Sequence, residues 1–519
     1  MPFIDLNKQS LGSTGEEFDV VVIGAGAAGI LLAVSMTAKG QKVLLVESGH
    51  FEEDQDRQSL NTVRQTGKQM GTAVWGRKRA IGGTTIAWGG QSLPFSPLDL
   101  SKRSWVANSG WPIPYEDIER YYLPANRFMN IDGLDYEGDV LKLLGMSRPE
   151  FDAKKVWYHF SKWAPEPNFR KLYTRQLSEG VTVLYNAVLS RIDCDGSTGR
   201  VRRVQLRNFE GAAVDLGVKT LILATGGIET NRILLSNNHQ YPKGLGGGSD
   251  WLGKCFMEHP CLDIGKVVSD RQYRLQSFFN THIAKRRKYS IRLSLAEQYQ
   301  RSHGLLNGSA SIMFAYPDEE SDPYLRMQRA LRRKSLTGLA GLIGHARTYA
   351  LGAGALLRDK LVYKHGAESR VVMMLEQEPL RESSISLSDE LDRFGTPLAK
   401  INWVISEKTW NTVLRFTDLL VAEFGRLGIG GLAVSEAISA GNLNWQSCFS
   451  DVNHHMGGTR LSASPANGVV NPSLQVWGHD NLFVCSSSVY PTGSHSNPTL
   501  TLLALSLRLV DFLNSGTYK

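Results

Sequence analysis

Three glycines and a glutamate near the start of the chain have the types and spacing of a dinucleotide-binding turn. Gly24, Gly26 and Gly29 lie in the motif GAGAAG, and Glu47 follows 23 positions after the first of them. The first glycine permits a tight turn, the second lets the backbone approach a pyrophosphate, and the third allows close packing of helix on strand. The carboxylate is placed to accept a hydrogen bond from a ribose 2′-hydroxyl. This acid disfavours the 2′-phosphate of NADP, whereas FAD and NAD both remain open.

The residues around this turn predict the strand–helix–strand unit that must position it. Residues 18–23 form a largely apolar run, residues 30–38 are helix formers, and KVLLVE ends a second apolar run at Glu47. A phosphate would then lie at the helix N-terminus, where free N–H groups and the helix dipole favour anions. These features together indicate a dinucleotide site, and the alternative is a glycine turn without a ligand.

A second group of glycines follows in IGGTTIAWGG, residues 81–90. Because hydroxyl side chains lie between glycines, this loop can press backbone amides against a flat polar ligand. The alternative is a glycine-rich surface loop. The candidate ligand-binding residues of the loop are Gly82, Gly83, Thr84, Thr85, Trp88 and Gly89. Further along, residues 218–237 predict a buried strand, a glycine turn and a helix start, which would return to the dinucleotide sheet after an inserted segment.

Two motifs near the C-terminus accompany a strongly apolar helix. The first reads NHHMGGTRLS over residues 453–462, and the second is SNPTLT. In the second motif, Asn497 suits the N-cap and Pro498 suits the first helical position. The helix is predicted to run to about Leu513 and to be buried, since it is apolar on most faces. Its positive end would then point into the interior, towards an electron-rich group.

Taken in order, these motifs resemble those of the glucose–methanol–choline (GMC) flavoprotein oxidoreductases. The resemblance rests on GAGAAG, a GG(T/S)-rich loop about sixty residues later, an ATG strand end, HxxGT and a closing NPTLT helix. It covers residues 18–90, 218–237 and 453–513, and the rest matches only in layout. HHMGGTR together with SNPTLT is most similar to the pyranose oxidase and glycoside 3-oxidase branch, and to sugar-acid and polyol dehydrogenases.

The resemblance implies an FAD cofactor, with its isoalloxazine between the loop at 81–90 and the C-terminal segment. It places the catalytic histidine at His455 and its partner at Asn497. Further cofactor contacts are implied at Ala224, Gly226, Ser486, Pro498 and Thr499. Some relatives attach the flavin to a histidine where this chain has Ala87, so we expect non-covalent FAD. Ser486 stands where the family usually has aspartate, so one flavin-chain hydrogen bond would be made differently.

Alcohol oxidation needs a base for the hydroxyl proton and an acceptor for the hydride. A neutral imidazole suits the first task, and flavin N5 the second. His454 is the alternative base, because in an extended segment only one of two neighbours faces the flavin; the spacing to GT favours His455. His495 either lines the site or lies on an exposed loop. Asn497 would orient the alcohol, or act only as an N-cap, and the other histidines (His159, His259 and His345 among them) belong to no recognisable constellation.

The predicted fold class is α/β (α+β overall), with a Rossmann-like doubly wound FAD domain and an inserted antiparallel-sheet substrate domain. Residues 370–406 read as antiparallel strands roofing the flavin. The predicted parts are 1–254 (FAD domain, with an excursion near 91–180), 255–450 (substrate domain, with a basic helical insertion near 326–364) and 451–519 (C-terminal FAD part). The basic insertion is read as a helical lid, with an oligomer arm or a membrane-surface helix as alternatives.

Composition excludes several other classes of protein. The chain has 519 residues, 42% of them hydrophobic, and a net charge of +8, which does not argue for nucleic-acid binding. Five cysteines without CxxC spacing argue against a disulfide scaffold or a zinc site, so no metal is predicted. Neither a signal peptide nor a membrane span is recognisable, and the expected location is cytoplasmic. A homo-oligomer is possible.

The leading hypothesis is FAD-dependent oxidation of a secondary alcohol of a sugar or glycoside to a ketone. Oxygen or a quinone-type acceptor would re-oxidise the flavin. A first alternative is a dehydrogenase for polyols or sugar acids that passes electrons to a quinone or a cytochrome. A second is a non-redox, flavin-containing lyase.

Overall fold

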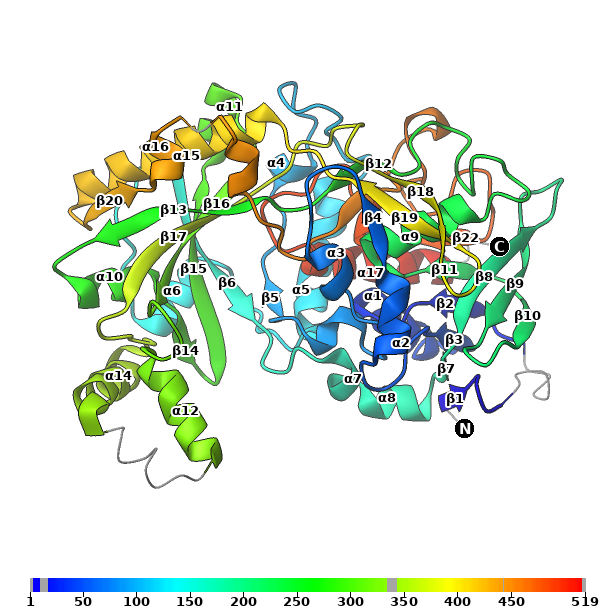
Figure 1. Ribbon diagram of the computed structural model, residues 1–519, viewed down its shortest axis with the longest axis horizontal. Coiled ribbons are helices and arrows are strands. Elements are labelled where there is room, and N and C mark those ends of the chain that lie inside the picture. The colour runs from blue at the N-terminus through cyan, green and yellow to red at the C-terminus, as the bar shows by residue number, and fades with distance from the viewer. Residues whose placement is uncertain (1–2, 10–16, 334–342, 442, 516–519) are drawn as a thin grey trace.

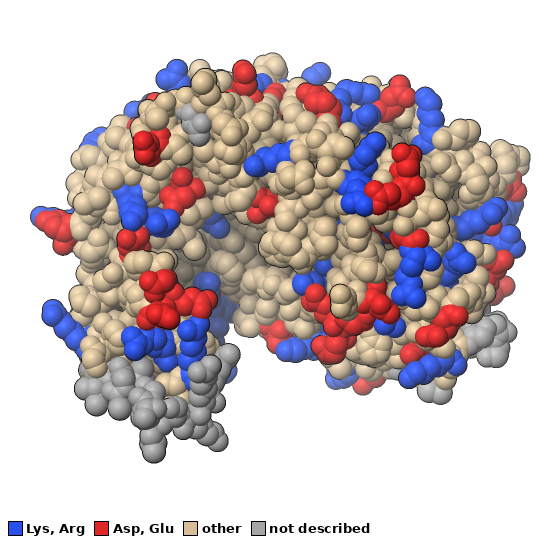
Figure 2. Space-filling view, viewed as in Figure 1, with Lys and Arg blue, Asp and Glu red and all other residues tan. Residues whose placement is uncertain are grey.

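The computed structural model describes residues 3–9, 17–333, 343–441 and 443–515. Two lobes lie side by side, and the surface is hollowed between them (Figure 1 and Figure 2). One lobe, on the right in Figure 1, carries both ends of the chain and a parallel sheet, and the other is built on a large antiparallel sheet. The α/β fold class predicted from the sequence is confirmed.

A six-stranded parallel sheet forms the centre of the first lobe, in the order β1-β7-β3-β2-β11-β22. Its strands are β1 (Phe3–Asp5), β2 (Val20–Ile23), β3 (Val43–Val46), β7 (Thr182–Tyr185), β11 (Leu221–Leu223) and β22 (Leu482–Val484). The sequences VVVI and VLLV of β2 and β3 are buried throughout, as expected for strands covered on both faces. Helix α17 packs on α1 and on α5 beside this sheet. The bounds of these helices are Ala27–Thr37 (α1), Tyr115–Phe128 (α5) and Thr499–Asn514 (α17).

An eight-stranded antiparallel sheet forms the second lobe, in the order β20-β13-β17-β16-β15-β6-β5, with β14 paired to β15. Its strands are β5 (Gln91–Ser92), β6 (Val156–Trp163), β13 (Cys261–Val268), β14 (His282–Ala284), β15 (Arg287–Leu295), β16 (Gly308–Ala315), β17 (Glu368–Leu375) and β20 (Gly431–Val434). Strands β5 and β6 come from the stretch that the sequence marks as an excursion near 91–180. This lobe is therefore assembled from separate parts of the chain.

The two faces of the antiparallel sheet differ in polarity. On β15, Ile291 and Leu293 join the apolar cluster beneath α10 (Gln272–Phe279) and α15 (Glu407–Leu427). The alternate residues, Arg292 and Ser294, lie on the other face, as the two-residue period of a strand requires. A helix-covered apolar face and an opposite polar face result.

A five-stranded sheet has at one edge the strand β21, which directly follows the two histidines of the C-terminal motif, and its order is β21-β12-β18-β19-β4. Its strands are β4 (Val63–Gln65), β12 (Lys254–Met257), β18 (Ser384–Leu391), β19 (Pro397–Asn402) and β21 (Met456–Gly458). The strands expected within residues 370–406 thus divide between two sheets, because β17 pairs with β13 and β16 whereas β18 and β19 form a hairpin elsewhere. The prediction that they form a single sheet is wrong, and their position over the flavin stays a prediction.

The remaining elements lie around these sheets. The strands of a small antiparallel sheet are β8 (Val188–Cys194), β9 (Val201–Arg207) and β10 (Ala213–Gly217). The helices are α2 (Gln55–Gln58), α3 (Thr72–Trp75), α4 (Pro97–Leu100), α6 (Gly138–Leu144), α7 (Phe169–Leu172), α8 (Thr174–Glu179), α9 (Gly226–Ser236), α11 (Glu297–His303), α12 (Pro323–Arg333), α14 (Ala346–Asp359) and α16 (Glu436–Ser439). Helices α12 and α14 form the basic insertion and project from the outer end of the second lobe (Figure 1). Residues 334–342 between them lie outside the described residues. None of the described helices is both long and apolar enough to cross a membrane.

Candidate active site

The glycine turn between β2 and α1 leaves open space where the sequence predicts a pyrophosphate. Gly24 has φ +101°, and a Cβ there would lie 2.6 Å from the carbonyl oxygen of Ala224. A Cβ at Gly26 would meet no atom within 4 Å. No side chain caps the N-terminus of α1, which follows Gly26 directly. The turn therefore combines a tight fit to β11 with an open, uncapped helix end that fits an anion.

Glu47 lies at the end of β3, with only 5% of its surface exposed. Its two carboxylate oxygens accept the N–H groups of Ala25 at 2.9 Å and Gly49 at 2.8 Å. Burial raises the pKa of this carboxyl, and the two backbone donors oppose the shift. The side chain thus fixes the glycine turn, in addition to the ribose contact that remains a prediction.

The second glycine loop lies against the first. A Cβ on Gly83 would lie 2.7 Å from Cα of Gly26, so only glycine fits this contact. The hydroxyl of Thr85 accepts the N–H of Phe169, and the indole N–H of Trp88 donates to the carbonyl of Pro167 at 2.7 Å. Thr85 and Trp88 thereby hold the loop in place. The exposed members of the loop are Thr84, Ala87 and Gly89.

Three more of the predicted cofactor residues lie shortly after strands β11 and β22. Ala224 ends the β11 segment against Gly24, and Gly226 has φ +77° with open space where a Cβ would stand. The hydroxyl of Ser486 accepts the N–H of Ser488 and donates to its hydroxyl. Ser486 therefore caps its own turn.

The C-terminal helix begins one residue later than predicted. It starts at Thr499, after Pro498, and no side chain caps it. Asn497 is consequently not the N-cap, and its amide nitrogen lies 3.0 Å from Nε2 of His454. The helix end is left with free N–H groups that fit an electron-rich ligand.

His455 contacts residues other than Asn497. Its Nε2 lies 3.2 Å from the hydroxyl of Thr72 and 3.7 Å from a carboxylate oxygen of Glu258, and its ring stacks on Phe256. Burial, with the nearby charge of Arg77, lowers the pKa of His455 to about 3. The spacing to GT suggests that His455 is the partner of Asn497. In the structure, Asn497 is bonded to His454 instead.

A chain of hydrogen bonds fixes the tautomer of His454. The carbonyl of Gly493 only accepts, so Nε2–H of His259 donates to it at 3.1 Å. Nδ1 of His259 is then an acceptor for Nδ1–H of His454, at 2.8 Å. The Nε2 lone pair of His454 therefore faces Asn497, and it can accept a proton.

The surroundings keep these imidazoles neutral. Burial is the main cause that lowers the pKa of His454 well below its usual value, and the nearby Arg292 and the neighbouring imidazoles His259 and His455 disfavour its protonation further. Burial likewise lowers the pKa of His259 to about 4. Glu258 accepts the backbone N–H groups of both His259 and His454, and burial raises its pKa to about 8. One buried carboxyl group thus holds the backbone of both histidines.

A second histidine group lies on the polar sheet face. Nε2 of His159 lies 2.7 Å from the hydroxyl of Ser294, which lies 3.1 Å from Nε2 of His495. His495 is only 2% exposed, so it is not on an exposed loop. These bonds join the sheet to the C-terminal segment.

Sequence reasoning missed His259, His159 and Ser294 as site residues. His259 is 195 positions from His454, and His159 is 135 positions from Ser294. No local motif marks such contacts. Among the described residues, no cluster of histidine, cysteine, aspartate or glutamate has the arrangement of a metal site.

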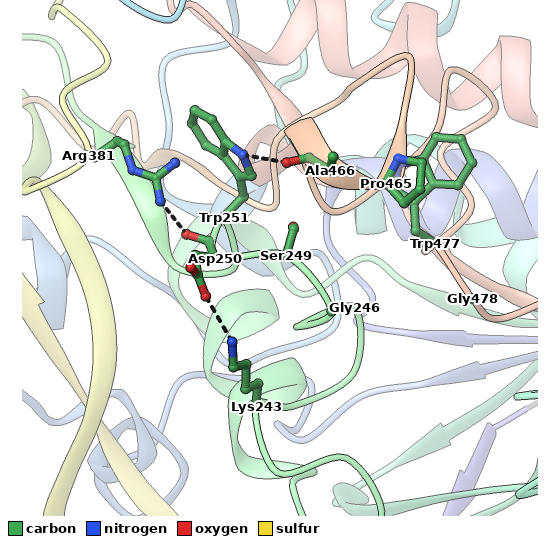
Figure 3. A pocket seen from close by; sticks show the side chains of 11 residues that line it. Lys243, Gly246, Ser249, Asp250, Trp251, Arg381, Pro465, Ala466, Trp477 and Gly478 are labelled. Atoms are coloured by element: carbon green, nitrogen blue, oxygen red, sulfur yellow. Dashed lines mark hydrogen bonds and ion pairs between the residues drawn. The ribbon is translucent and has the colours of Figure 1, made fainter.

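A separate surface pocket contains none of these residues (Figure 3). Its rim is closed by its own contacts, since Arg381 lies over the ring of Trp251 and donates to the carbonyl of Asp250. Asp250 also pairs with Lys243 at 3.0 Å. We assign no role in the chemistry to this pocket.

Comparison with known proteins identifies two regions of the chain and the class of enzyme. Residues 19–54 match an FAD binding domain, and residues 379–506 match GMC oxidoreductases. The second match includes His454, His455 and Asn497. The fold and the two matches define a flavin-dependent oxidoreductase acting on CH–OH groups, and its cofactor is non-covalent FAD. Residues 379–506 are thus a C-terminal domain of the GMC type, and the chain as a whole is similar to GMC oxidoreductases.

Several relatives cover most or part of the chain. It is 23% identical to 2-methyl-1,2-propanediol dehydrogenase of Mycolicibacterium austroafricanum, over 97% of this chain and 96% of that protein. It is 24% identical to 6‴-hydroxyparomomycin C oxidase of Streptomyces lividus, over 96% and 91%. A C-glycoside 3-oxidase of Microbacterium trichothecenolyticum is 29% identical over 24% of this chain and 23% of its own. The fold is similar to that of pyridoxine 4-oxidase from Mesorbium loti, with a TM-score of 0.55 and 14% identity over 96% and 99% of the two chains.

Proposed function

We propose that this enzyme oxidises a secondary alcohol of a sugar or glycoside to a ketone, with His454 as the base. The observation that carries the proposal is the Nε2 lone pair of His454, fixed by His259 and facing Asn497 at 3.0 Å. This pair stands beside the uncapped start of α17.

In the proposed reaction, Nε2 of His454 accepts the hydroxyl proton of the substrate. Nδ1–H of His454 stays bonded to His259, so the new positive charge is shared with a second imidazole. The amide of Asn497 donates to the alcohol oxygen and orients it. The chemistry that FAD supplies when bound is acceptance of the hydride that leaves the carbinol carbon.

The residues around the proposed cofactor position fit FAD. Open space at Gly26 and at Gly226 would admit backbone-to-phosphate contacts, and α1 and α17 both begin without side-chain caps. Glu47 lies where the ribose would be held. The glycine loop at 81–90 would flank the flavin ring.

A polyhydroxylated substrate is supported by the polar face of the substrate-lobe sheet. Hydroxyl and imidazole groups replace apolar side chains on that face, and they can donate to and accept from sugar hydroxyls. The names of the aminoglycoside oxidases and the C-glycoside 3-oxidase among the relatives agree with this class.

A second candidate concerns the electron acceptor. Two relatives that match nearly the whole chain are named as dehydrogenases, for 2-methyl-1,2-propanediol and, in a large subunit from Gluconobacter japonicus, for fructose. They support a polyol or sugar dehydrogenase that uses a quinone or cytochrome in place of oxygen. The cytoplasmic location and homo-oligomeric state stay predictions.

Anaerobic mixing of the holoenzyme with sugars, glycosides and polyols tests the function, with flavin bleaching as the readout. Reduction by any of them supports alcohol oxidation, whereas the absence of bleaching favours the lyase alternative. Re-oxidation by oxygen compared with benzoquinone then identifies the acceptor.

Parallel variants test the choice of base. His454→Ala should keep its FAD and its rapid reduction by dithionite, yet lose about 10²- to 10⁴-fold in substrate reduction rate. Asn497→Ala should lose less, because it orients and does not transfer a proton. His455→Ala is the matched control. If it abolishes reduction while His454→Ala stays active, the motif spacing is the better guide and the proposed base is incorrect.

A further inference from the structure

Arg292, on the polar face of the substrate-lobe sheet, is a cation that has no anionic partner among the described residues. It lies within β15, next to His159 of β6 in the register of the sheet. Its guanidinium makes only two long contacts, 3.3 Å to the hydroxyl of Ser311 and 3.4 Å to the side-chain oxygen of Gln91. Within the described part of the chain, no carboxylate lies within 4.0 Å of it.

The other groups near this guanidinium add no negative charge. Its positive charge helps to lower the pKa of His159, His454 and His495, which are kept neutral mainly by burial. Burial also lowers the pKa of Arg292 itself. Cys261 lies close enough to interact with it, but burial raises the pKa of that thiol to about 11, so the thiol is uncharged at neutral pH.

Arg103, which is fully buried, shows by contrast how an arginine of this chain is paired with a carboxylate. Both terminal nitrogens of Arg103 donate to the carboxylate oxygens of Glu376, and both side chains are fully buried. Desolvating a guanidinium is costly unless a counter-charge replaces water. Arg292 is only partly buried, and among the described residues no such counter-charge lies within 4.0 Å of it, so its guanidinium can pair with an incoming anion.

We propose that Arg292 binds a carboxylate of the substrate, so that the preferred substrates are acidic sugars such as uronides or aldonates. The inference rests on the proposed function, because it places the substrate between the polar sheet face and His454. Guanidinium and carboxylate match as a planar, two-bond pair. One positive charge among neutral neighbours balances a monoanion, and a dianionic phosphate would keep an uncompensated charge.

Matched pairs of substrates test this inference on the holoenzyme. Methyl glucuronide is compared with methyl glucoside, and gluconate with glucitol, by anaerobic flavin reduction. The parent enzyme should favour the acidic member of each pair. Arg292→Met should raise the KM for the acids on the order of 10- to 150-fold, the range for a hydrogen bond to a charged group, with the neutral members changed less than threefold.

Two further variants separate binding from folding. Arg292→Lys keeps the charge but not the two-bond geometry, so it should restore part of the preference for acids. Ser311→Ala removes only a long hydrogen bond, and it should leave the preference intact. FAD content is measured for every variant, so that loss of the cofactor is not mistaken for loss of substrate binding.

Each of the other possible results of these experiments would refute a specific part of the proposal. Equal use of acidic and neutral sugars by the parent would refute the carboxylate contact and leave alcohol oxidation standing. No reduction by any alcohol would refute the proposed function itself. A preference for glucose 6-phosphate over gluconate would refute the monoanion. An equal slowing of all substrates in Arg292→Met, with a shifted flavin reduction potential, would mean that the guanidinium faces the reduced flavin.

Discussion

Acid should destabilise this enzyme through its buried histidines, and His495 allows the effect to be measured for one residue. Burial, with the nearby charges of Arg292 and His259, lowers the pKa of His495 to about 3. The unfolded chain binds that proton near pH 6.5, as an ordinary histidine does. Between these values the unfolded state holds more protons than the folded state, so the free energy of unfolding falls as the pH falls.

The lowered pKa determines how steeply the free energy of unfolding changes with pH. One buried histidine contributes up to about 1.4 kcal/mol per pH unit in that window, and roughly 2 kcal/mol between pH 6.5 and pH 5. Three more histidines have lowered pKa values of about 3 or 4: His259, His282 and His455. Glu258 acts in the opposite direction, because its pKa is raised to about 8 and its protonation favours folding as the pH falls towards 4.5. A variant must therefore be compared with the parent at each pH.

The assay is urea unfolding at pH 7.5, 6.5, 5.5 and 5.0, followed by tryptophan fluorescence. His495→Asn removes the titrating ring, so its stability should decline by about 2 kcal/mol less than that of the parent between pH 6.5 and 5. Ser294→Ala is the control, because it removes the hydroxyl bonded to His495 and keeps the imidazole. It should lower stability by a similar amount at every pH. Parallel pH curves for parent and His495→Asn would show that this imidazole takes up its proton inside the fold, against the reasoning.

Three further predictions concern the cofactor, the core and the base. Glu47→Ala should weaken FAD binding by about 1.5–3 kcal/mol with near-normal turnover at saturating FAD, because a charged acceptor is lost; titration of the apoprotein measures this, and unchanged affinity would place the ribose elsewhere. Glu376→Gln should lower the free energy of unfolding by about 3–5 kcal/mol, since Arg103 would remain buried beside a neutral amide; urea unfolding measures it, and replacement of both residues by apolar ones should recover part of the loss. The flavin reduction rate should stay constant from pH 7 to pH 6, below the range in which Glu258 ionises, and decline only at much lower pH, because the pKa of His454 is well below its usual value; stopped-flow reduction measures it, and an inflection near pH 6.5 would contradict the assignment.

The sequence predicted correctly those elements whose conformation depends on a short stretch of residues. The glycine turn with its strands and helix, and the apolar C-terminal helix, follow from short runs of sequence whose hydrophobicity and glycine spacing leave few conformations. The helix end at Asn514 lies within one residue of the expected Leu513. The division of β17 and β18 between two sheets was not predictable, because both strands have the same alternation and differ only in their distant partners.

The choice between two neighbouring histidines shows the same limit at the site. Motif spacing places His455 at the family position, whereas Asn497 reaches His454 in the structure. The bond from His259 that fixes the tautomer joins residues 195 positions apart. The lack of a carboxylate beside Arg292 in the described part of the chain is also invisible in sequence, because it depends on how residues far apart in the sequence fold around the guanidinium.

The last strand of the parallel sheet has a consequence for how the chain is made. Leu482 of β22 pairs with Leu221 of β11, which in turn pairs with β2 near the N-terminus. During synthesis on the ribosome, the edge of β11 that pairs with β22 therefore stays unpaired until residues 482–484 have been made. Contacts between such distant residues slow folding, and an open strand edge promotes aggregation. Nascent chains that stop before β22 should accumulate as insoluble, colourless protein, because the sheet and the helix end expected to face the flavin are both delivered last.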